Sequence, residues 1–341
     1  MAHFVIIIFF VTILRDLDDI RTFIFWMIFD EKALNSCYFL SRRKTFMTAI
    51  AHRPIIQATI VNYLLLLTTI VFWASAFVGI RMGLKSYTPG PLALLRYGIA
   101  SIAIIPLYIK YRSHAQLTKT ELVTAFLAGF LGIGFYNAAL NYGELTVPAG
   151  IASFTIGQVP IFTALLALFL LKEKLSISGW IGIFISMIGI SIITISQSSA
   201  LSFNVGVIYI LLAAISASFF IILQKPLLKK INAIEFVSLA IWSGTVCLLI
   251  FLPPLPHQLM HASLQSTFSV IYLSLCPGVI AYITWSMALK RLTAVKASSF
   301  LYITPIVSTL LGWIILKENI SMLSFAGGCI ALVGSIIVQK K

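Results

Sequence analysis

Long runs of apolar residues alternate with short polar breaks along the chain from about residue 60 to the C-terminus. A helix that crosses a bilayer needs about 20 consecutive apolar residues, and the breaks contain prolines, glycines or charges that typically end helices. The pattern therefore predicts an all-α integral membrane protein with ten transmembrane helices. Their expected bounds are about 60–80, 91–110, 122–142, 148–170, 177–196, 204–224, 234–254, 268–289, 294–315 and 321–338.

The second half of the chain repeats the first at a constant offset of 145 residues. Shared apolar bias explains matched leucines, but it does not explain proline, glutamate and glycine matched in register. The matched positions are Pro160 with Pro305, Glu173 with Glu318, Gly182 with Gly327, and Gly189 with Gly334. Such a repeat in a membrane chain is typical of transporters built from two related halves. We expect two repeats of five helices each.

An odd number of helices in each half means that the second half enters the membrane from the opposite side. The two halves are then inverted relative to each other. Placing the start of the first helix in the cytoplasm puts nearly all Lys and Arg residues of the breaks on the cytoplasmic side. Arg81, Lys85 and Lys317 fall on the outside, and Arg96 lies within a predicted helix. This agrees with the positive-inside rule. We expect a multi-pass protein of the bacterial cell inner membrane with both termini cytoplasmic.

The composition fits a membrane chain. Hydrophobic residues make up 60% of the 341 residues, charged residues make up 10%, and the mean hydropathy is +1.03. Soluble domains contain about 45–50% apolar and about 25% charged residues. The formal net charge of +14 follows from topology, and without a soluble basic domain we expect no nucleic acid as a partner.

Residues 1–57 do not fit the repeat and form a partly apolar N-terminal extension, which is expected to be interfacial or disordered. Its first apolar run, Phe4 to Leu14, is too short to span a membrane. Translation that begins at Met47 would explain this extension, and a functional eleventh helix is the alternative. The two repeats are expected over residues 58–198 and 203–338.

Three features carry a resemblance to a known family: the run Trp73 to Phe77 in the first helix, the run Pro91 to Arg96 at the second, and the doubled spacing from proline to glutamate. Together they resemble the drug/metabolite transporter superfamily, in its ten-helix EamA-type branch, over about residues 60–338. One departure is in the sixth helix. Here Ser216-Ala217-Ser218 stands where the family often has an aromatic residue before a small pair.

The resemblance implies a secondary transporter, commonly an exporter of amino acids or other small metabolites, and not an enzyme. It also implies a cavity between the halves, lined mainly by helices 1, 3, 4, 6, 8 and 9. Inverted repeats independently favour a site near the membrane midplane, with alternating access by rocking of the halves. The expected partners are a small-molecule substrate and the lipid bilayer, and a homodimer is left open.

Polar and aromatic side chains deep in the predicted helices are the candidates for the substrate path. They are Trp73, Ser75, Arg96, Asn137, Asn141, Gln158, Tyr282, Trp285, Tyr302 and Thr304. Each of them alone is more often a helix–helix hydrogen bond than a ligand contact. Their clustering in equivalent helices of both halves favours a shared path, and a neutral polar and aromatic lining suits zwitterions or amphipathic small molecules.

Arg96 differs from the other candidates because it is a cation within a predicted span. Ionisable groups in membrane helices are functional candidates by default. Its long side chain either snorkels to the outer interface or makes a structural contact, or its guanidinium pairs with a partner or with a substrate carboxylate.

The repeated prolines and glutamates have different expected roles. Pro160 and Pro305 each remove a backbone donor and free the carbonyl four residues earlier, which gives either a packing kink or a bent helix that lines the path and acts as a hinge. Glu173 and Glu318 follow at helix ends. They are expected to be structural, favoured by the dipole of the next helix.

Several kinds of chemistry are excluded by the sequence. No glycine-rich phosphate loop with a lysine is present, which excludes primary ATP-driven transport by this chain alone. His257 and His261 are four residues apart but no neighbouring ligand completes a metal site, so no metal or cofactor is expected. A membrane-embedded enzyme acting on a lipid-linked substrate and an efflux pump for drug-like amphipathic compounds are the alternatives.

Overall fold

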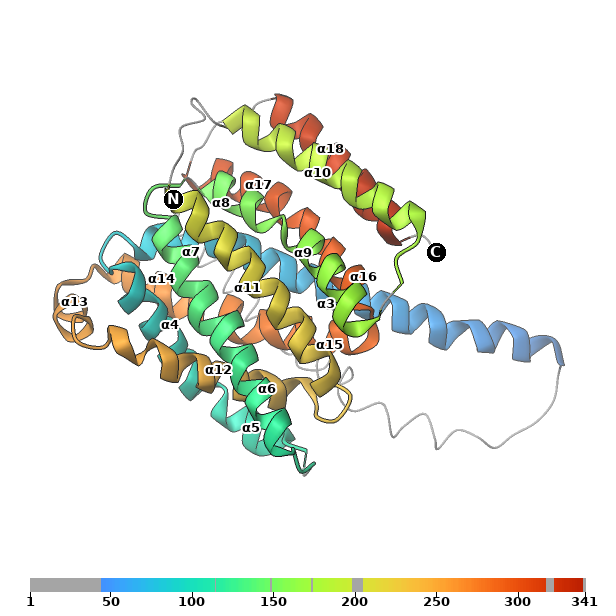
Figure 1. The fold of residues 1–341 in the computed structure, drawn as a ribbon, viewed down its shortest axis with the longest axis horizontal. Helices are drawn as coiled ribbons and strands as arrows, with labels where there is room; N and C mark the ends of the chain where they lie inside the picture. Colours follow the sequence, from blue (N-terminus) through green and yellow to red (C-terminus); the bar gives the residue numbers. More distant parts are fainter. Residues whose placement is uncertain are drawn as a thin grey trace. The chain divides into compact units, whose positions relative to one another are not determined.

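A computed structural model describes residues 44–113, 115–147, 149–172, 174–197, 205–316 and 322–339. The chain divides into two compact units, Met1–Ile60 and Val61–Lys341. Glu173, Glu318 and most of the predicted N-terminal extension lie outside the described residues. The described part of the chain is all-helical (Figure 1).

The first half contains the helices that correspond to the first five predicted spans. In chain order they are α3 (Lys44–Gly83), α4 (Pro89–Ala103), α5 (Ile105–Tyr111), α6 (Lys119–Gly129), the π-helix η2 (Phe130–Phe135), α7 (Tyr136–Gly143), α8 (Ala149–Ile156), α9 (Val159–Leu166), the π-helix η3 (Ala167–Leu171) and α10 (Ile177–Gln197).

The second half follows the same order. Its elements are α11 (Val205–Leu227), α12 (Ala233–Leu248), the 3-10 helix η4 (Leu249–Phe251), α13 (Leu255–His261), α14 (Leu264–Leu275), the π-helix η5 (Cys276–Ile280), α15 (Ala281–Arg291), α16 (Ala294–Ser299), the 3-10 helix η6 (Phe300–Ile303), α17 (Thr304–Leu316) and α18 (Met322–Gln339).

Eight helices of the described chain are long and apolar enough to cross a membrane, by length and composition. The helices at the fifth and tenth predicted positions, α10 and α18, contribute only the shorter apolar stretches Ile177–Gly189 and Cys329–Val338. The chain is therefore a multi-pass membrane protein. The count of ten spans stays a prediction.

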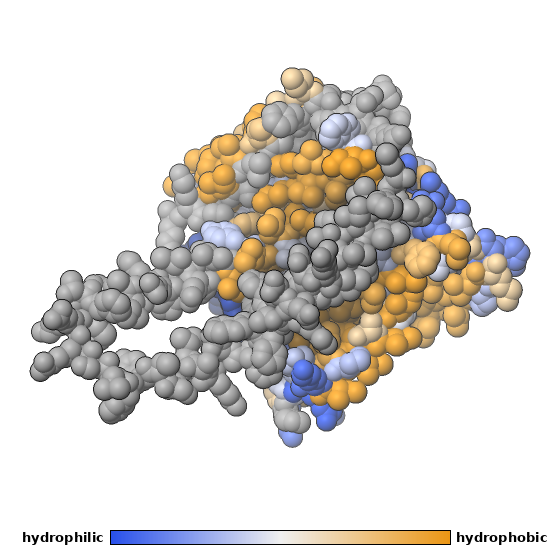
Figure 2. All heavy atoms as spheres, turned by 180° about the vertical axis from the view of Figure 1, so that it is seen from behind, coloured by the Kyte–Doolittle hydropathy of each residue, from blue (hydrophilic) through white to orange (hydrophobic). Residues whose placement is uncertain are grey.

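Apolar side chains cover much of the outer surface, as expected for helices that face lipid. Figure 2 shows a broad apolar face with hydrophilic residues gathered towards its ends. Phe169 and Ile250, for example, are exposed to 74% and 75%. Exposed apolar surface on this scale would be unfavourable in water and is favourable in a bilayer.

Helix ends are set by local capping groups. Thr118 and Glu121 form a reciprocal capping box at the start of α6, in which each side chain satisfies a backbone donor of the other residue. The Glu121 carboxylate also pairs with Lys230 at 2.5 Å. At the start of α12, Asn232 caps the helix by accepting from the Glu235 backbone N–H.

Irregular helical segments recur at equivalent places in the two halves. The π-helix η2 interrupts the third predicted span, and η5 interrupts the eighth. The fourth span breaks at the turn Gly157-Gln158, just before Pro160, and the ninth narrows into the 3-10 helix η6, just before Pro305. Such interruptions within membrane helices are tolerated where neighbouring groups or a cavity satisfy the freed backbone, and π-bulges are frequent at functional sites.

The glycines matched in the repeat bring α10 and α18 into close contact, and Figure 1 draws these helices side by side. A Cβ placed on Gly189 would lie 2.4 Å from the Ala331 backbone nitrogen and 2.5 Å from the Gly327 carbonyl oxygen. A Cβ on Gly334 would lie 2.4 Å from the Ser186 backbone nitrogen. Small residues let membrane helices approach closely, so the repeated glycines are required by this packing.

Candidate functional site

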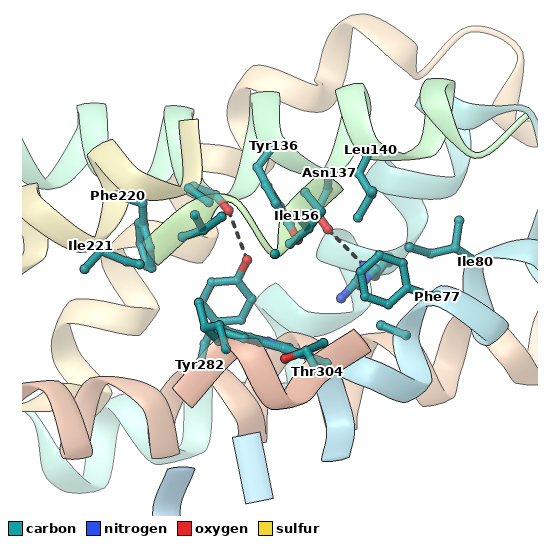
Figure 3. Close-up of a pocket in the computed structure, with 18 residues that line it drawn as sticks. Phe77, Ile80, Tyr136, Asn137, Leu140, Ile156, Phe220, Ile221, Tyr282 and Thr304 are labelled. Carbon is teal, nitrogen blue, oxygen red and sulfur yellow. Dashed lines mark hydrogen bonds between the residues drawn. The ribbon is translucent and has the colours of Figure 1, made fainter. Parts of the chain in front are cut away.

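A cavity lies among the helices of the second unit, and both halves of the repeat line it (Figure 3). Its volume is about 60 Å³, and one water needs roughly 10–15 Å³. The cavity therefore admits a few waters or part of a small solute. Its lining residues are Trp73, Ala76, Phe77, Ile80, Arg96, Gly132, Tyr136, Asn137, Leu140, Ile156, Gly157, Val159, Ala217, Phe220, Ile221, Tyr282, Leu301 and Thr304.

These residues come from the predicted helices 1, 3, 4, 6, 8 and 9, with Arg96 added from the second helix. Trp73, Ala76, Phe77 and Ile80 follow the spacing i, i+3, i+4, i+7, which places them on one face of α3. The other walls are formed largely by the interrupted helices. The backbone irregularities described above therefore gather around one cavity.

Arg96 gives the cavity a polar end. Its Nε donates to the Leu273 carbonyl oxygen at 3.1 Å, and its Nη1 donates to Asn137 Oδ1 at 2.9 Å. Asn137 in turn donates from Nδ2 to the Ile133 carbonyl oxygen at 3.0 Å. The arginine is 3% exposed. It is held inside the protein by neutral acceptors, and it does not snorkel to the surface.

Among the described residues, no carboxylate lies within ion-pair distance of the Arg96 guanidinium. The ion pair found there joins Lys230 and Glu121. Burying a charge is costly unless it is paired, and a membrane-embedded arginine usually faces a partner or a water-filled cavity. Arg96 lines the cavity. It provides a positive group with unused donors at the edge of a cavity that can receive an anion.

Aromatic rings form the side of the cavity near Tyr282. The Trp73 ring lies 5.3 Å from the rings of both Tyr282 and Trp285, measured between centroids. Phe220 packs edge-on against Tyr282 at 5.7 Å. Such contacts stabilise aromatic clusters.

Two of these aromatic side chains also satisfy backbone carbonyls of the π-helices. The Tyr282 hydroxyl donates to the Gly132 carbonyl in η2 at 3.0 Å (Figure 3), and Trp73 Nε1 donates to the Pro277 carbonyl in η5 at 3.3 Å. These bonds join the third span to the eighth and the first to the eighth. Each crosses from one half of the repeat to the other.

The repeated prolines lie next to the cavity without lining it. Pro160 removes the N–H that would bond the carbonyl of Ile156, and Pro305 does the same for Leu301. Both Ile156 and Leu301 line the cavity. The adjacent Thr304 lines it too, and its buried Oγ1 has no hydrogen-bond partner. The second half thus contributes an unused polar group at the broken helix.

The structure brings five of the predicted path residues to the cavity: Trp73, Arg96, Asn137, Tyr282 and Thr304. The others pack around it. Ser75 bonds the Tyr272 hydroxyl at 2.6 Å, and Asn141 Nδ2 donates to the Pro89 carbonyl at 3.0 Å. Gln158 lies in the turn before α9 without lining the cavity. Trp285 and Tyr302 are fully buried beside it.

Several lining residues were missed by sequence reasoning because they are apolar. Phe77, Leu140, Phe220 and Ile221 carry no polar signal that separates them from residues facing lipid or core. Tyr136 does carry a signal in the sequence, since it is near-equivalent to Tyr282 across the repeat, with a shift of one residue. Within the described ranges, no group of three His, Cys, Asp or Glu side chains could hold a metal ion.

Comparison with known proteins agrees with this architecture. The sequence model described as the EamA-like transporter family matches twice, at residues 60–195 and 204–339. "Uncharacterized transporter YdfC" of Bacillus subtilis (strain 168) is 38% identical over 269 residues, which cover 79% of this chain and 88% of that protein. "Uncharacterized inner membrane transporter YedA" of Escherichia coli (strain K12) is 28% identical over 75% of this chain and 83% of that protein.

A third relative has a name that includes a substrate. The "Probable terminal-alkyne amino-acid exporter" of Streptantibioticus cattleyicolor is 32% identical over 280 residues, which cover 81% of this chain and 92% of that protein. A protein of solved crystal structure shares the fold, with a TM-score of 0.64 at 17% identity over 81% of this chain and 95% of that chain. This chain therefore belongs to the EamA-like transporter family, within the drug/metabolite transporter superfamily, whose members transport small molecules across membranes.

Proposed function

We propose that this protein is a secondary transporter that exports amino acids or closely related zwitterionic metabolites across the inner membrane by alternating access. The observation that carries the proposal is Arg96, a buried cation without a carboxylate partner among the described residues, at the edge of a cavity lined by both halves. The relative named as an amino-acid exporter supports the same substrate class.

The cavity offers complementary groups for the two ends of a zwitterion. The Arg96 guanidinium is suited to a carboxylate, because its planar fork of donors matches two carboxylate oxygens. Thr304 Oγ1 is an unused acceptor on the other half, and the faces of Trp73 and Tyr282 attract cations. A zwitterionic substrate whose carboxylate and ammonium groups are both bound in this way would contact both halves of the repeat at once.

Alternating access follows from this two-sided binding. We infer that the halves are inverted five-helix repeats, that both termini are cytoplasmic, and that the halves rock around the cavity. The helix breaks before Pro160 and Pro305 are the places where the spans can bend with little loss of backbone hydrogen bonding. The hydrogen bonds from Trp73 to Pro277 and from Tyr282 to Gly132 would break or shift as the halves separate.

Efflux of drug-like amphipathic compounds is the second candidate, and the aromatic and apolar lining favours it. The two candidates differ in their use of Arg96. A cationic amphipathic drug would be repelled by the guanidinium, whereas a zwitterion is held by it. The substrate preference therefore separates the candidates.

A counterflow assay tests the proposal. The purified full-length protein is reconstituted in liposomes loaded with an unlabelled compound, and uptake of the same labelled compound is followed for neutral amino acids, nucleosides and quaternary ammonium drugs. We expect saturable uptake of amino acids only. Uptake of ammonium drugs alone would favour the second candidate, and no saturable uptake in any class would refute the proposed function.

A further inference from the structure

Glu144 is a completely buried carboxyl group without a hydrogen-bond partner. It follows α7 at the C-cap position, is 0% exposed, and neither Oε1 nor Oε2 has a partner. The other acidic side chains of the described residues are satisfied. Glu121 pairs with Lys230, and the Glu235 carboxylate accepts from the backbone N–H of Ser113 at 2.9 Å. Glu144 is therefore an exception that packing alone does not explain.

The groups around Glu144 come from each neighbouring helix. Arg81 of α3 is the positive charge that acts most strongly on the Glu144 carboxyl. Its Nη1, however, donates to the backbone carbonyl oxygen of Glu144 at 2.9 Å rather than to the carboxyl group. Arg96 of α4 and Tyr136 of α7 interact with it electrostatically. From α11, the Tyr209 ring lies 5.9 Å from the Tyr142 ring in a tilted arrangement, and α8 carries no ionisable residue.

Burial therefore dominates the protonation of this group. It raises the pKa of the Glu144 carboxyl well above its usual range, while Arg81 and Arg96 act in the opposite direction. An isolated ionised carboxylate is too costly to bury, so such a group takes up a proton instead. Burial in this conformation therefore favours the protonated, neutral form of the Glu144 carboxyl.

A row of polar residues leads from the cavity to Glu144. Asn137, Asn141 and Glu144 are spaced by four and three residues, which places them on one face of the helix. They span about 10 Å at a rise of 1.5 Å per residue. All three are buried, and Asn141 Oδ1, like the Glu144 carboxyl oxygens, has no partner. Asn137 itself lines the cavity and bonds Arg96.

The connection after Glu144 closes this end of the row. Leu145 is half exposed, whereas Val147 is buried. Arg81 Nη1 also donates to the Val147 carbonyl oxygen at 3.5 Å. One guanidinium therefore contacts two carbonyl groups of the segment that follows α7, those of Glu144 and Val147. Gly206 at the start of α11 packs against the same turn. Water can reach Glu144 from this end only when the turn separates from these neighbours.

We propose that Glu144 is a proton-binding site that couples transport to the proton gradient. The proposal rests on the proposed transport function. Glu144 binds a proton from water when this end of the bundle opens, and the neutral carboxyl lets the end close again. When the halves then open towards the cytoplasm, water that enters through the cavity past Asn137 and Asn141 takes up the proton, and the ionised carboxylate favours reopening of the outer end. With cytoplasmic termini, Glu144 lies at the outer end, so protons enter as substrate leaves.

The transport test uses Glu144→Gln, which keeps the size of the side chain but cannot ionise. In liposomes with a labelled amino acid, the wild type is expected to show both counterflow and accumulation driven by a pH gradient. The variant is expected to lose gradient-driven accumulation and to show slower counterflow that no longer depends on pH. The control Glu235→Gln, which alters a carboxylate with hydrogen-bond partners, is expected to keep the gradient response.

Gradient-driven accumulation that persists in Glu144→Gln would overturn the proposal, as would wild-type counterflow without any response to pH. Absence of counterflow in the wild type would instead refute the transport function.

Thermal unfolding in detergent tests proton binding without substrate. A carboxyl whose pKa is raised in the folded protein binds its proton more tightly there, so its contribution to stability falls as pH rises above its unfolded value of about 4.5. The unfolding temperature of the wild type is therefore expected to fall relative to Glu144→Gln between pH 4.5 and 8. A difference between the two proteins that is constant with pH would show that Glu144 does not titrate.

If Glu144→Gln fails to fold, Glu144→Asp serves in both tests. Its pH response is expected to be displaced from that of the wild type, and an unchanged response would contradict the proposal.

Discussion

Replacing Arg96 with Gln is expected to abolish most amino-acid transport while leaving the protein folded. The glutamine retains a donor for a neighbouring acceptor, but it removes the positive charge and the planar fork of donors. Removing one partner of a buried, hydrogen-bonded charge pair costs about 2–5 kcal/mol, so kcat/KM for transport should fall roughly thirty-fold or more at 1.4 kcal/mol per factor of ten. Initial rates of counterflow over a range of substrate concentrations measure this change.

Two control variants make this result specific. Arg96→Lys keeps the charge without the fork, and it is expected to recover only part of the rate, because a lysine binds as a point charge. Arg112→Gln removes the same group from an exposed position and should transport like the wild type. Full transport by Arg96→Gln, at normal protein abundance, would show that the guanidinium has only a structural role.

Replacing Gly189 with Ala is expected to destabilise the protein. The added Cβ would lie 2.4 Å from the Ala331 backbone nitrogen, and a backbone atom cannot turn aside as a flexible side chain can. Helices α10 and α18 must separate, and overpacking of this kind costs about 1–3 kcal/mol. The expected result is a lower thermal unfolding temperature of the purified protein in detergent.

The matched control is Gly98→Ala in α4, where an added Cβ meets nothing within 4 Å. Alanine is favoured over glycine inside a helix by about 1 kcal/mol, and this gain applies to both variants. The difference between the two unfolding temperatures therefore isolates the close approach of α10 and α18. Equal unfolding temperatures would mean that these helices are not packed as described.

The fold class could be predicted from sequence because its causes are local. The bilayer sets the length of apolar runs, and residues such as Gly189 and Gly334 leave a repeat that is visible without structure. The role of these glycines in packing could not be predicted, because the close contact of α10 with α18 joins two segments that are far apart in the chain. The count of ten spans stays a prediction, since the described apolar stretches in α10 and α18 are short.

The candidate site was predicted only in part. Trp73, Arg96 and Tyr282 carry polar or aromatic chemistry that is unusual at depth, and the structure brings them to one cavity. Phe77 and Phe220 look like any apolar residue in a membrane helix, so only tertiary packing distinguishes them. Glu144 comes directly after the predicted third span, so its position in the sequence indicates only a helix end. Its complete burial depends on Arg81 and on the turn that follows, which periodicity cannot show.

The most direct measurement of the central claim compares an amino acid with its carboxamide as competitors of labelled amino-acid counterflow. The carboxamide keeps the ammonium group and the side chain but removes the negative charge that Arg96 is proposed to bind. The account predicts that the wild type strongly prefers the acid and that Arg96→Gln loses most of this preference. An equal preference for the acid in both proteins would contradict the account, because the carboxylate would then be recognised elsewhere.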